Sequence, residues 1–462
     1  MKIALIRPPE VNPYWSSPEP LLGTGYLAAY LESHGYDVRI LDANYHGWTQ
    51  RQIINGLVEY GPDLVGFSSM THEIKAAHAI AVRMKDRLKE VPTVVGGCHV
   101  TALPSQTLQE FPGFTYGVFG EGEETLLELV RYLEKGTEAD LQNIAGLVHR
   151  DQQNRIVCNV ERPSLAKEKL DKLPYPALHQ YHQNAHALKG PKRHYTIMAG
   201  RGCPYQCAFC MQVLGRQVRR RSAENVVGEI EHAIHAFGAH TIYFADEIFL
   251  FNDRITYETF ELIKQRGLPK RIRWRANTRV NLVNDRLLKA AKEAGCYLLE
   301  IGIESGNDEI LKVINKQITV EQAEAAVQSI KKAGIGVSAN FILGHPHETR
   351  QTIKATVDLA TRLNTDTIAV GLMVPYPGTR IYEMAKRGEG GYRLLTEDWS
   401  SYDKYGNRAL EIEGLPINVL ETWQRKSIVY FYIKNFRFID FFRFILEYRK
   451  TILKLIFRNH AA

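Results

Sequence analysis

The stretch Gly202-Cys203-Pro204-Tyr205-Gln206-Cys207-Ala208-Phe209-Cys210 places three of the chain's six cysteines within eight residues. The spacing, Cys-x3-Cys-x2-Cys, puts three thiolates on one short loop, which is enough to hold three irons of a [4Fe–4S] cube and leaves the fourth iron open. A zinc site is the alternative, but it usually has a fourth Cys or His at matched spacing. No second pair occurs, although His182, His186 or His194 could supply one ligand. The spacing therefore favours an iron–sulfur cluster.

The cysteine loop stands near the start of a series of strand and helix patterns. The strand candidates are 195–198, 241–244, 273–276, 297–303, 337–342 and 367–373, with helical patterns between them. Six such units at this spacing predict a partial (β/α)6 barrel, whose active site lies at the carboxyl ends of its strands. The cysteine loop follows the first strand, so we expect it at the mouth of this barrel.

A separate α/β pattern precedes the barrel. Its strand candidates are 3–6, 38–41, 64–68, 93–95 and 116–119, and its helical patterns are 22–34, 50–60, 74–89 and 123–135. Strands that alternate with helices predict a parallel, Rossmann-like sheet covered on both faces, and such sheets bind ligands beyond the carboxyl ends of their strands. No Gly-x-Gly-x-x-Gly follows the first strand, which weakens the case for a dinucleotide. We expect this domain over 1–140, a connector over 141–194, the barrel over 195–385 and a helical C-terminal region over 386–462.

The charge of the chain is concentrated at one end. Among 462 residues, 58 are Lys or Arg and 51 are Asp or Glu, and residues 425–462 contain nine of the former and two of the latter, which is the whole excess. Such a distribution does not indicate a protein that coats nucleic acid generally. There is no uncharged apolar run of about 18 residues that could span a membrane. The early Pro8-Pro9 interrupts any signal-peptide pattern, so we expect a cytoplasmic protein.

The cysteine loop closely resembles that of the radical S-adenosylmethionine (SAM) enzymes, in which SAM chelates the open iron. Phe209 occupies the aromatic position before the third cysteine, and Cys203, Cys207 and Cys210 would hold the cluster. The stretches 300–306, 341–349 and 374–379 resemble later SAM-contacting segments of that family. The stretch Phe244-Ala245-Asp246-Glu247 departs from the family's Gly-Gly-Glu, which leaves open which acidic group meets the SAM amino group. The SAM-binding residues that the resemblance implies are Phe209, Asp246, Glu247, Glu304, Ser305, Ile342, Gly344 and Pro375.

Two arginines on the third barrel strand are candidates for a different reason. The guanidinium groups of Arg275 and Arg279 match the geometry of a carboxylate, so either could clamp the SAM carboxylate. Either could equally form a salt bridge within the barrel. We include Arg275 in the expected SAM site.

The N-terminal domain resembles the cobalamin-binding domain that precedes the barrel in one large radical SAM subfamily. The stretches 18–31, 96–101 and 120–125 carry the resemblance. Their glycines would let the backbone approach a large planar ring. The Asp-x-His-x-x-Gly motif of another cobalamin family is absent, so we expect His99 beside the corrin or its tail rather than on cobalt, and the residue under cobalt among 69–71. The expected cobalamin-binding residues are Gly23, Ser69, Met70, Thr71, Gly96, Gly97, His99, Gly120, Glu121, Gly122 and Glu123.

The C-terminal segment combines aromatic and basic residues. Its aromatic residues are Trp423, Tyr430, Phe431, Tyr432, Phe436, Phe438, Phe441, Phe442, Phe444, Tyr448 and Phe457. Because these would lie almost all round a helix, the pattern favours a cap packed on the barrel, with Lys and Arg reaching outward. Peripheral contact with an anionic membrane is the alternative. No nucleic-acid-binding module accompanies these aromatic residues, so we expect no nucleic-acid partner.

Together the resemblances cover about residues 1–380 and imply a cobalamin-dependent radical SAM methyltransferase. It would methylate an unactivated carbon, or a phosphinate phosphorus, of a small-molecule or lipid-like substrate by means of methylcobalamin and a 5′-deoxyadenosyl radical. A one-electron reductant such as flavodoxin or ferredoxin would be a partner. Two alternatives remain: a cobalamin-dependent cyclase or ring-rearrangement enzyme, and, from a different class, a cofactor-binding sensor without catalysis.

Overall fold

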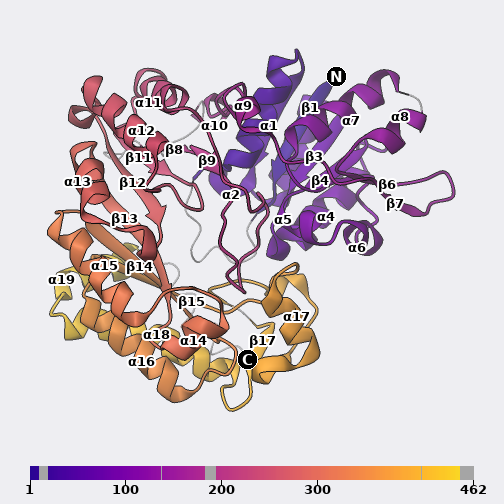
Figure 1. Ribbon diagram of the computed structural model, residues 1–462. Helices are drawn as coiled ribbons and strands as arrows, with labels where there is room; N and C mark the ends of the chain where they lie inside the picture. Colours follow the sequence, from indigo (N-terminus) through magenta and orange to yellow (C-terminus); the bar gives the residue numbers. More distant parts are fainter. Residues whose placement is uncertain (10–18, 137, 183–193, 407, 448–462) are drawn as a thin grey trace. The chain divides into compact units, whose positions relative to one another are not determined.

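The computed structural model describes residues 1–9, 19–136, 138–182, 194–406 and 408–447 (Figure 1). Pro18, His186, Tyr448 and Phe457, which the sequence analysis singled out, lie outside these residues. The chain divides into two compact units. One holds most of residues 1–240, and the other holds residues 205–210 and the chain from Thr241 onward.

The first unit contains a seven-stranded sheet in the order β2-β1-β3-β4-β5-β6-β7. Strands β1 to β5 pair in parallel, and β6 and β7 extend the sheet as antiparallel strands. The central strands β1 and β3 are buried over nearly their whole length because helices cover both faces. The strands are β1 (Lys2–Arg7), β2 (Asp37–Asp42), β3 (Leu64–Ser68), β4 (Thr93–Gly96), β5 (Tyr116–Val118), β6 (Leu147–Arg150) and β7 (Ile156–Cys158).

Residues 22–143 contain eight α-helices among the described residues. The predicted helix at 123–135 is confirmed residue for residue, whereas the one predicted over 74–89 ends earlier, at Met84. The helices are α1 (Leu22–Ser33), α2 (Ala43–His46), α3 (Gln50–Tyr60), α4 (Ile74–Met84), α5 (Cys98–Ala102), α6 (Pro104–Glu110), α7 (Glu123–Lys135) and α8 (Glu138–Asn143). The predicted Rossmann-like α/β fold is thus confirmed.

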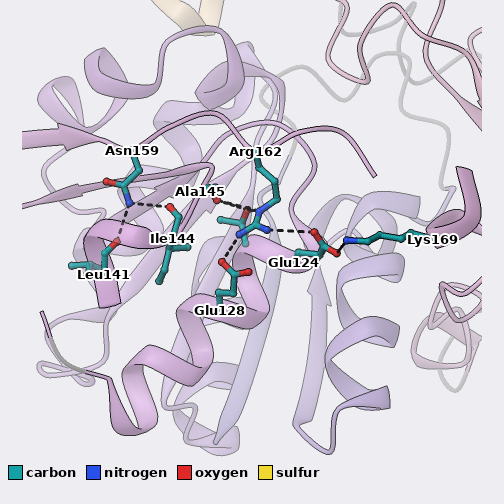
Figure 2. Close-up of polar contacts among 9 residues, drawn as sticks. Glu124, Glu128, Leu141, Ile144, Ala145, Asn159, Arg162 and Lys169 are labelled. Carbon is teal, nitrogen blue, oxygen red and sulfur yellow. Dashed lines mark hydrogen bonds and ion pairs between the residues drawn. The ribbon is translucent and has the colours of Figure 1, made fainter. Parts of the chain in front are cut away.

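Arg162 fixes the segment after β7 to helix α7 (Figure 2). Its guanidinium donates to the Thr125 hydroxyl at 2.8 Å and to the Ala145 carbonyl at 3.2 Å, and forms ion pairs with Glu124 and Glu128. Beside it, the Asn159 amide donates to two carbonyls at the end of α8. These contacts anchor α7, and the loop before α7 is one of the expected cofactor loops.

The first unit continues into short elements that lead toward the barrel strands. Helices α9 (Lys167–Leu170) and α10 (His179–His182) precede strand β8 (His194–Ile197). The strands β9 (Gly200–Arg201) and β10 (Arg219–Arg220) form an antiparallel pair, and the cysteine loop lies between them in the sequence. Helix α11 (Ala223–Phe237) follows, capped by the Ser222 hydroxyl.

A second, six-stranded sheet has the order β15-β14-β13-β12-β11-β8 (Figure 1). Its further strands are β11 (Thr241–Phe244), β12 (Arg273–Thr278), β13 (Cys296–Glu304), β14 (Gly336–Leu343) and β15 (Thr367–Leu372), all paired in parallel. The helices between and after them are α12 (Arg254–Gln265), α13 (Asp285–Glu293), α14 (Asp308–Val313), α15 (Val320–Lys332), α16 (Arg350–Leu363) and α17 (Arg380–Arg387). This confirms the predicted partial barrel.

Burial alternates along these strands, so the two faces of the sheet differ. On β14 the residues Val337, Ala339 and Phe341 are buried, whereas Ser338, Asn340 and Ile342 between them are half-buried. On β12 the same alternation buries Trp274 and Ala276 and leaves Arg275 and Asn277 on the more open face. Because side chains of a strand point alternately to opposite faces, the helix-covered face is apolar and the other face is polar.

The C-terminal region packs on the edge of the second sheet. It consists of β16 (Tyr392–Leu394), β17 (Leu410–Ile412), α18 (Ile417–Lys434) and α19 (Phe438–Glu447). Helix α18 lies against β15 and α16, where Phe431 is fully buried and the Gln424 amide donates to the Val370 carbonyl at 2.8 Å. In the described part of the chain no helix combines the length and apolarity that a membrane span requires.

Candidate functional site

A pocket opens at the carboxyl end of the first sheet, where its strand order reverses between β1 and β3. Ligands of open α/β sheets bind at such switch points. The pocket encloses about 940 Å³ of empty space, its open mouth included. Its walls come from the ends of β3, β4 and β5 and from the first turns of α1 and α7, including Gly23, Thr24, Ser68, Gly96, Gly97, Gly120, Glu121, Gly122 and Glu123.

Glycines shape this pocket in two ways. At Gly23 and Gly120 an added Cβ would meet no atom within 4 Å, so the missing side chains leave open space for a ligand. At Gly97, with φ of +107°, an added Cβ would lie 2.5 Å from the Ser69 carbonyl oxygen, so only glycine allows the β4 loop to approach the β3 loop. A wide, apolar and glycine-lined cavity fits a large planar cofactor such as a corrin.

The two acidic residues of the third loop are engaged in buried ion pairs. Arg201 donates to Glu123 at 2.6 Å, and Arg219 lies 2.8 Å from Glu121. The pKa of Glu121 is lowered, because hydrogen bonds from Arg219 and the charge of Arg201 outweigh the effect of burial. These carboxylates therefore attach the loop to β9 and β10, and their charge is balanced within the protein.

The remaining expected cobalamin residues lie apart from the pocket wall. His99 is 1% exposed in α5, its ring is 6.3 Å from that of Phe111, and burial lowers its pKa to about 4. Ser69 donates its hydroxyl to the Met70 carbonyl, Met70 is exposed, and Thr71 is buried. Among the described residues, none of these four belongs to the set that lines the pocket.

The cysteine loop has no regular secondary structure and is held by the second unit through Tyr205–Cys210. Ala208 N–H donates to the Ile314 carbonyl at 2.9 Å, and the Asn315 amide donates to the Gln206 carbonyl at 2.8 Å. Cys203 and Cys207 are half-buried and Cys210 is exposed, and none of the three forms a disulfide. Within the part of the chain that the structure describes, no three His, Cys, Asp or Glu side chains already share one metal position. The fit to a [4Fe–4S] cluster thus rests on three accessible thiols at the appropriate spacing.

Glu304 ends strand β13 in a left-handed backbone conformation, with φ of +73°. Its carboxylate forms a buried ion pair with Lys316 at 2.7 Å. An added Cβ at Gly302 would lie 2.2 Å from the Glu304 carboxylate, so a larger residue there would displace this side chain. Non-glycine residues rarely adopt this conformation, and such residues are enriched at functional sites, so the geometry is compatible with the expected role of Glu304.

The neighbouring loops contain further expected SAM residues. Ser305 is fully buried and lies 3.3 Å from the Thr356 hydroxyl of α16. Gly344, with φ of +98°, follows β14, and its N–H and that of His345 both donate to the Glu348 carboxylate. Burial raises the pKa of Glu348 to about 8 in spite of these two donors, and it lowers the pKa of His345 to about 4. Gly344, His345 and Glu348 are thus buried in this turn, whereas His347 is exposed, and the buried His345 and Glu348 side chains are mostly uncharged near neutral pH.

The other expected SAM residues differ in their surroundings. Arg275 forms an ion pair with Glu300 and lies 3.9 Å over the Tyr243 ring, so its charge is already balanced. Asp246 is buried, and its carbonyl accepts from the Asn277 amide at 2.9 Å, whereas Glu247 is exposed. Three more sit at strand ends or on the cysteine loop, where Ile342 and Phe209 are half-buried and Pro375 is buried.

The structure adds residues, and one residue role, that were not predicted from the sequence. Met198, Arg201 and Leu214 complete the wall of the glycine-lined pocket, although they lie on either side of the cysteine loop. Arg279, for which the sequence left open a carboxylate clamp or a salt bridge within the barrel, donates from Nη1 to the Cys207 sulfur at 3.3 Å. The position of Arg201 directly before the cysteine stretch is a feature of the sequence that could have drawn attention to this residue.

Two family models match the chain, one in each part. The model of the B12 binding domain matches residues 17–130, and the model of the Radical SAM superfamily matches residues 197–360. The first range contains the glycine-lined pocket loops, and the second contains the cysteine loop and the strands β11 to β14.

Named relatives extend the match over the whole chain. An uncharacterized methyltransferase of Pyrococcus horikoshii is 33% identical over 100% of this chain and 96% of its own length. The anaerobic magnesium-protoporphyrin IX monomethyl ester cyclase of Rubrivivax gelatinosus is 30% identical over 83% of this chain and 68% of its own length. The cytidylyl-2-hydroxyethylphosphonate methyltransferase of Streptomyces wedmorensis is 28% identical over 70% and 69%.

The fold has a close counterpart among solved structures. The radical S-adenosylmethionine methyltransferase TsrM of Kitasatospora setae, solved with cobalamin and a [4Fe–4S] cluster, matches with a TM-score of 0.72 at 18% identity, over 94% of this chain and 88% of that one. This similarity shows a shared fold, whereas the relatives named above show similarity of sequence. With the two family models and the full-length relative in agreement, the chain belongs to the B12-binding radical SAM enzyme family, as a member of its class B, methyltransferase-like group.

Proposed function

We propose that this enzyme transfers a methyl group to an unactivated carbon, or to a phosphinate phosphorus, of a small-molecule or lipid-like substrate. The cofactors of the family are a [4Fe–4S] cluster, SAM and cobalamin, and a one-electron reductant such as flavodoxin or ferredoxin would serve as partner. The observation that carries the proposal is the full-length similarity to a protein named as a methyltransferase. Relatives named as methyltransferases of a phosphonate, of bacteriochlorophyllide d and of hopanoids support it.

The chain's own residues would bind and orient these cofactors. When bound, the cofactors supply a methyl donor and a radical that removes a substrate hydrogen, chemistry that side chains alone do not provide. Gly23 and Gly120 would leave room for the corrin in the pocket, and Gly97 would let the β4 loop approach the β3 loop beside it. Glu121 and Glu123, neutralised by arginines, would keep that pocket free of uncompensated charge.

On the barrel side, the proposed SAM site combines one fixed carboxylate with a turn of low charge. Glu304 is held by Lys316, and the Glu304 carbonyl lies 3.3 Å from His345 Nε2. Because the pKa of His345 is near 4, this ring would stay neutral at physiological pH and neither attract nor repel the SAM sulfonium. Cys203, Cys207 and Cys210 would hold the cluster.

The proposal is tested with SAM that carries a deuterated methyl group. The reconstituted protein, a strong reductant and this SAM are added under anaerobic conditions to an extract of small molecules and lipids. Methyl transfer predicts a metabolite that gains the labelled methyl group, which mass spectrometry detects. A Cys207→Ala variant is the control and should yield no labelled product. If no labelled metabolite appears although SAM is consumed, the proposal fails.

A radical ring-forming reaction is a second candidate. Its support is the 30% identity to a protein named as a cyclase. A cyclase would consume SAM without leaving the label in its product. The labelled-methyl experiment therefore separates the two reactions.

We also propose that helix α19 touches an anionic membrane. One side of α19 packs on α18, because the rings of Phe441 and Phe444 lie 5.6 and 5.8 Å from that of Tyr432. On the other side, Phe438, Ile439 and Phe442 are 57 to 72% exposed, and Phe436 before the helix is 82% exposed. An exposed apolar helix face in a basic segment is typical of helices that lie in the surface of an anionic bilayer.

The basic residues near helix α19 support an anionic membrane as its partner. Lys434 and Arg443 are exposed in this segment, and Asp440 balances part of the charge of Arg443. Arg437 instead lies over the Phe431 and Tyr432 rings and also pairs with Asp440. The four basic residues beyond Glu447 lie outside the described residues. Basic side chains near an anionic surface add about 1 kcal/mol each to binding.

Sedimentation with vesicles tests the membrane contact. The full chain should sediment with vesicles that contain phosphatidylglycerol and less with phosphatidylcholine alone, and Ile439→Glu with Phe442→Glu should abolish this binding. Val160, which is 75% exposed in the first unit, provides the control Val160→Glu, which should bind like the wild type. Unchanged vesicle binding by the double variant contradicts the proposal.

A further inference from the structure

Arg279 has its charge directed at the cysteine loop. It follows β12 directly and is 6% exposed. Its Nη1 donates to the Cys207 sulfur at 3.3 Å, its Nη2 donates to the Lys316 carbonyl, and its guanidinium carbon lies 3.7 Å from the centre of the Tyr205 ring. A buried cation thus lies against a thiol that the family uses as an iron ligand.

The surroundings fix the guanidinium in this position. Nε donates to the Asn281 side chain at 3.3 Å, so each of the three guanidinium nitrogens has an acceptor. Tyr205 covers one face of the guanidinium, and Tyr205 itself belongs to the cysteine loop. Rotation of Arg279 away from Cys207 would leave buried N–H groups without acceptors, which is unfavourable.

Arg275, which lies four residues earlier on β12, differs from Arg279 in its partners. Arg275 is balanced by the carboxylate of Glu300. Within the described residues, the acceptors of Arg279 are a sulfur, a carbonyl and an amide oxygen, and none is a carboxylate. The positive charge of Arg279 is therefore available to stabilise negative charge on the cluster ligand.

We propose that Arg279 is a positioning residue that raises the reduction potential of the [4Fe–4S] cluster by donating a charged N–H to the Cys207 sulfur. Hydrogen bonds to cluster sulfurs and the charge near them set such potentials. Reduction adds one negative charge to the cluster, and a fixed cation nearby stabilises the reduced state more than the oxidised state. The inference rests on family membership and on Cys207 as an iron ligand, and it is independent of the reaction that follows.

A redox titration of the full-length protein tests the proposal. The wild type, Arg279→Gln and Arg279→Lys are reconstituted anaerobically, their iron and sulfide contents are measured, and the cluster signal is followed by electron paramagnetic resonance as the applied potential is lowered. SAM and substrate are left out. We expect the midpoint potential of Arg279→Gln to be more negative than that of the wild type, with Arg279→Lys in between.

Arg273→Gln is the matched control, since Arg273 lies on β12, the strand that Arg279 follows, and has its guanidinium over the Tyr297 ring. Its midpoint potential should equal that of the wild type. A fully loaded Arg279→Gln variant with an unchanged midpoint overturns the proposal. If that variant does not retain iron, Arg279→Lys decides: a more negative midpoint supports the proposal, and an identical midpoint overturns it. Because the titration uses no substrate, failure here leaves the methyl-transfer proposal untouched.

Discussion

Arg201 Nη2 and Glu123 Oε1 lie 2.6 Å apart with both side chains buried, and this contact joins strand β9 to the loop that lines the glycine-lined pocket. Arg201 also reaches Glu121, at 3.5 Å, which in turn binds Arg219. Four buried charged side chains thus balance one another. The pocket wall is consequently stabilised by residues from two distant parts of the sequence.

Replacing one of these four charged residues should destabilise the folded protein. We expect Arg201→Met to lower the free energy of unfolding by about 3–5 kcal/mol, because it leaves buried carboxylates without their partner. Denaturant unfolding measures the loss. The double variant Arg201→Met, Glu123→Gln should recover part of it, since it removes one of the unpaired charges. Equal stabilities of wild type and Arg201→Met would contradict this account of the contact.

Filling the pocket should weaken cobalamin binding without unfolding the protein. Gly23 lies in helix α1 with open space where a side chain would project, so Gly23→Leu fits the backbone and occupies the pocket. We expect its affinity for cobalamin to fall by about tenfold or more, equivalent to about 1.4 kcal/mol, as measured by absorbance titration. The control is Gly56→Ala in α3, whose new methyl would lie 3.7 Å from Leu41. Comparable affinities of Gly23→Leu and the wild type would argue for a different cobalamin site.

Iron content should depend on three cysteines and not on the others. We expect Cys203→Ala, Cys207→Ala and Cys210→Ala each to lose most iron and sulfide after anaerobic reconstitution, because each removes one of three ligands. Cys158 is exposed on β7, and Cys158→Ala should keep the wild-type iron content. Zinc without iron in the wild type would speak against the cluster.

The stability of the protein should depend on the protonation of Glu348. Its pKa is raised from 4.5 to about 8, mainly by burial, so the folded state binds this proton more tightly than the unfolded state. The resulting stabilisation is complete below pH 4.5 and is lost as the pH rises through about 8, by up to about 1.4 kcal/mol per pKa unit. Glu348→Gln should flatten this part of the pH profile of thermal unfolding. A profile that remains equally steep in the variant would assign the dependence to other groups.

The sequence predicted most of the fold because the two βα series have clear periods. Strand candidates such as 64–68 and helix candidates such as 123–135 match β3 and α7 exactly, since buried strands and amphipathic helices leave a local pattern. The glycine loops around Gly97 and Gly120 could also be anticipated, because turns and close backbone approaches require glycine.

Long-range polar contacts left no such pattern. Arg201 and Glu123 are 78 residues apart, and Arg279 and Cys207 are 72 residues apart. Nothing in the local sequence specifies that these pairs meet, since an isolated arginine is equally compatible with an exposed position. The contact of the buried His99 ring with Phe111 is likewise not specified by the local sequence. The position of His99 beside the corrin stays a prediction.

Methyl transfer is tested most directly by the products of SAM. The reconstituted protein, loaded with cobalamin, is incubated anaerobically with SAM, a reductant and a metabolite extract, and chromatography with mass spectrometry quantifies the nucleosides. A methyltransferase of this kind uses one SAM as methyl donor and another as radical source. We therefore predict S-adenosylhomocysteine and 5′-deoxyadenosine in similar amounts. Formation of 5′-deoxyadenosine without S-adenosylhomocysteine would contradict methyl transfer and favour the ring-forming alternative.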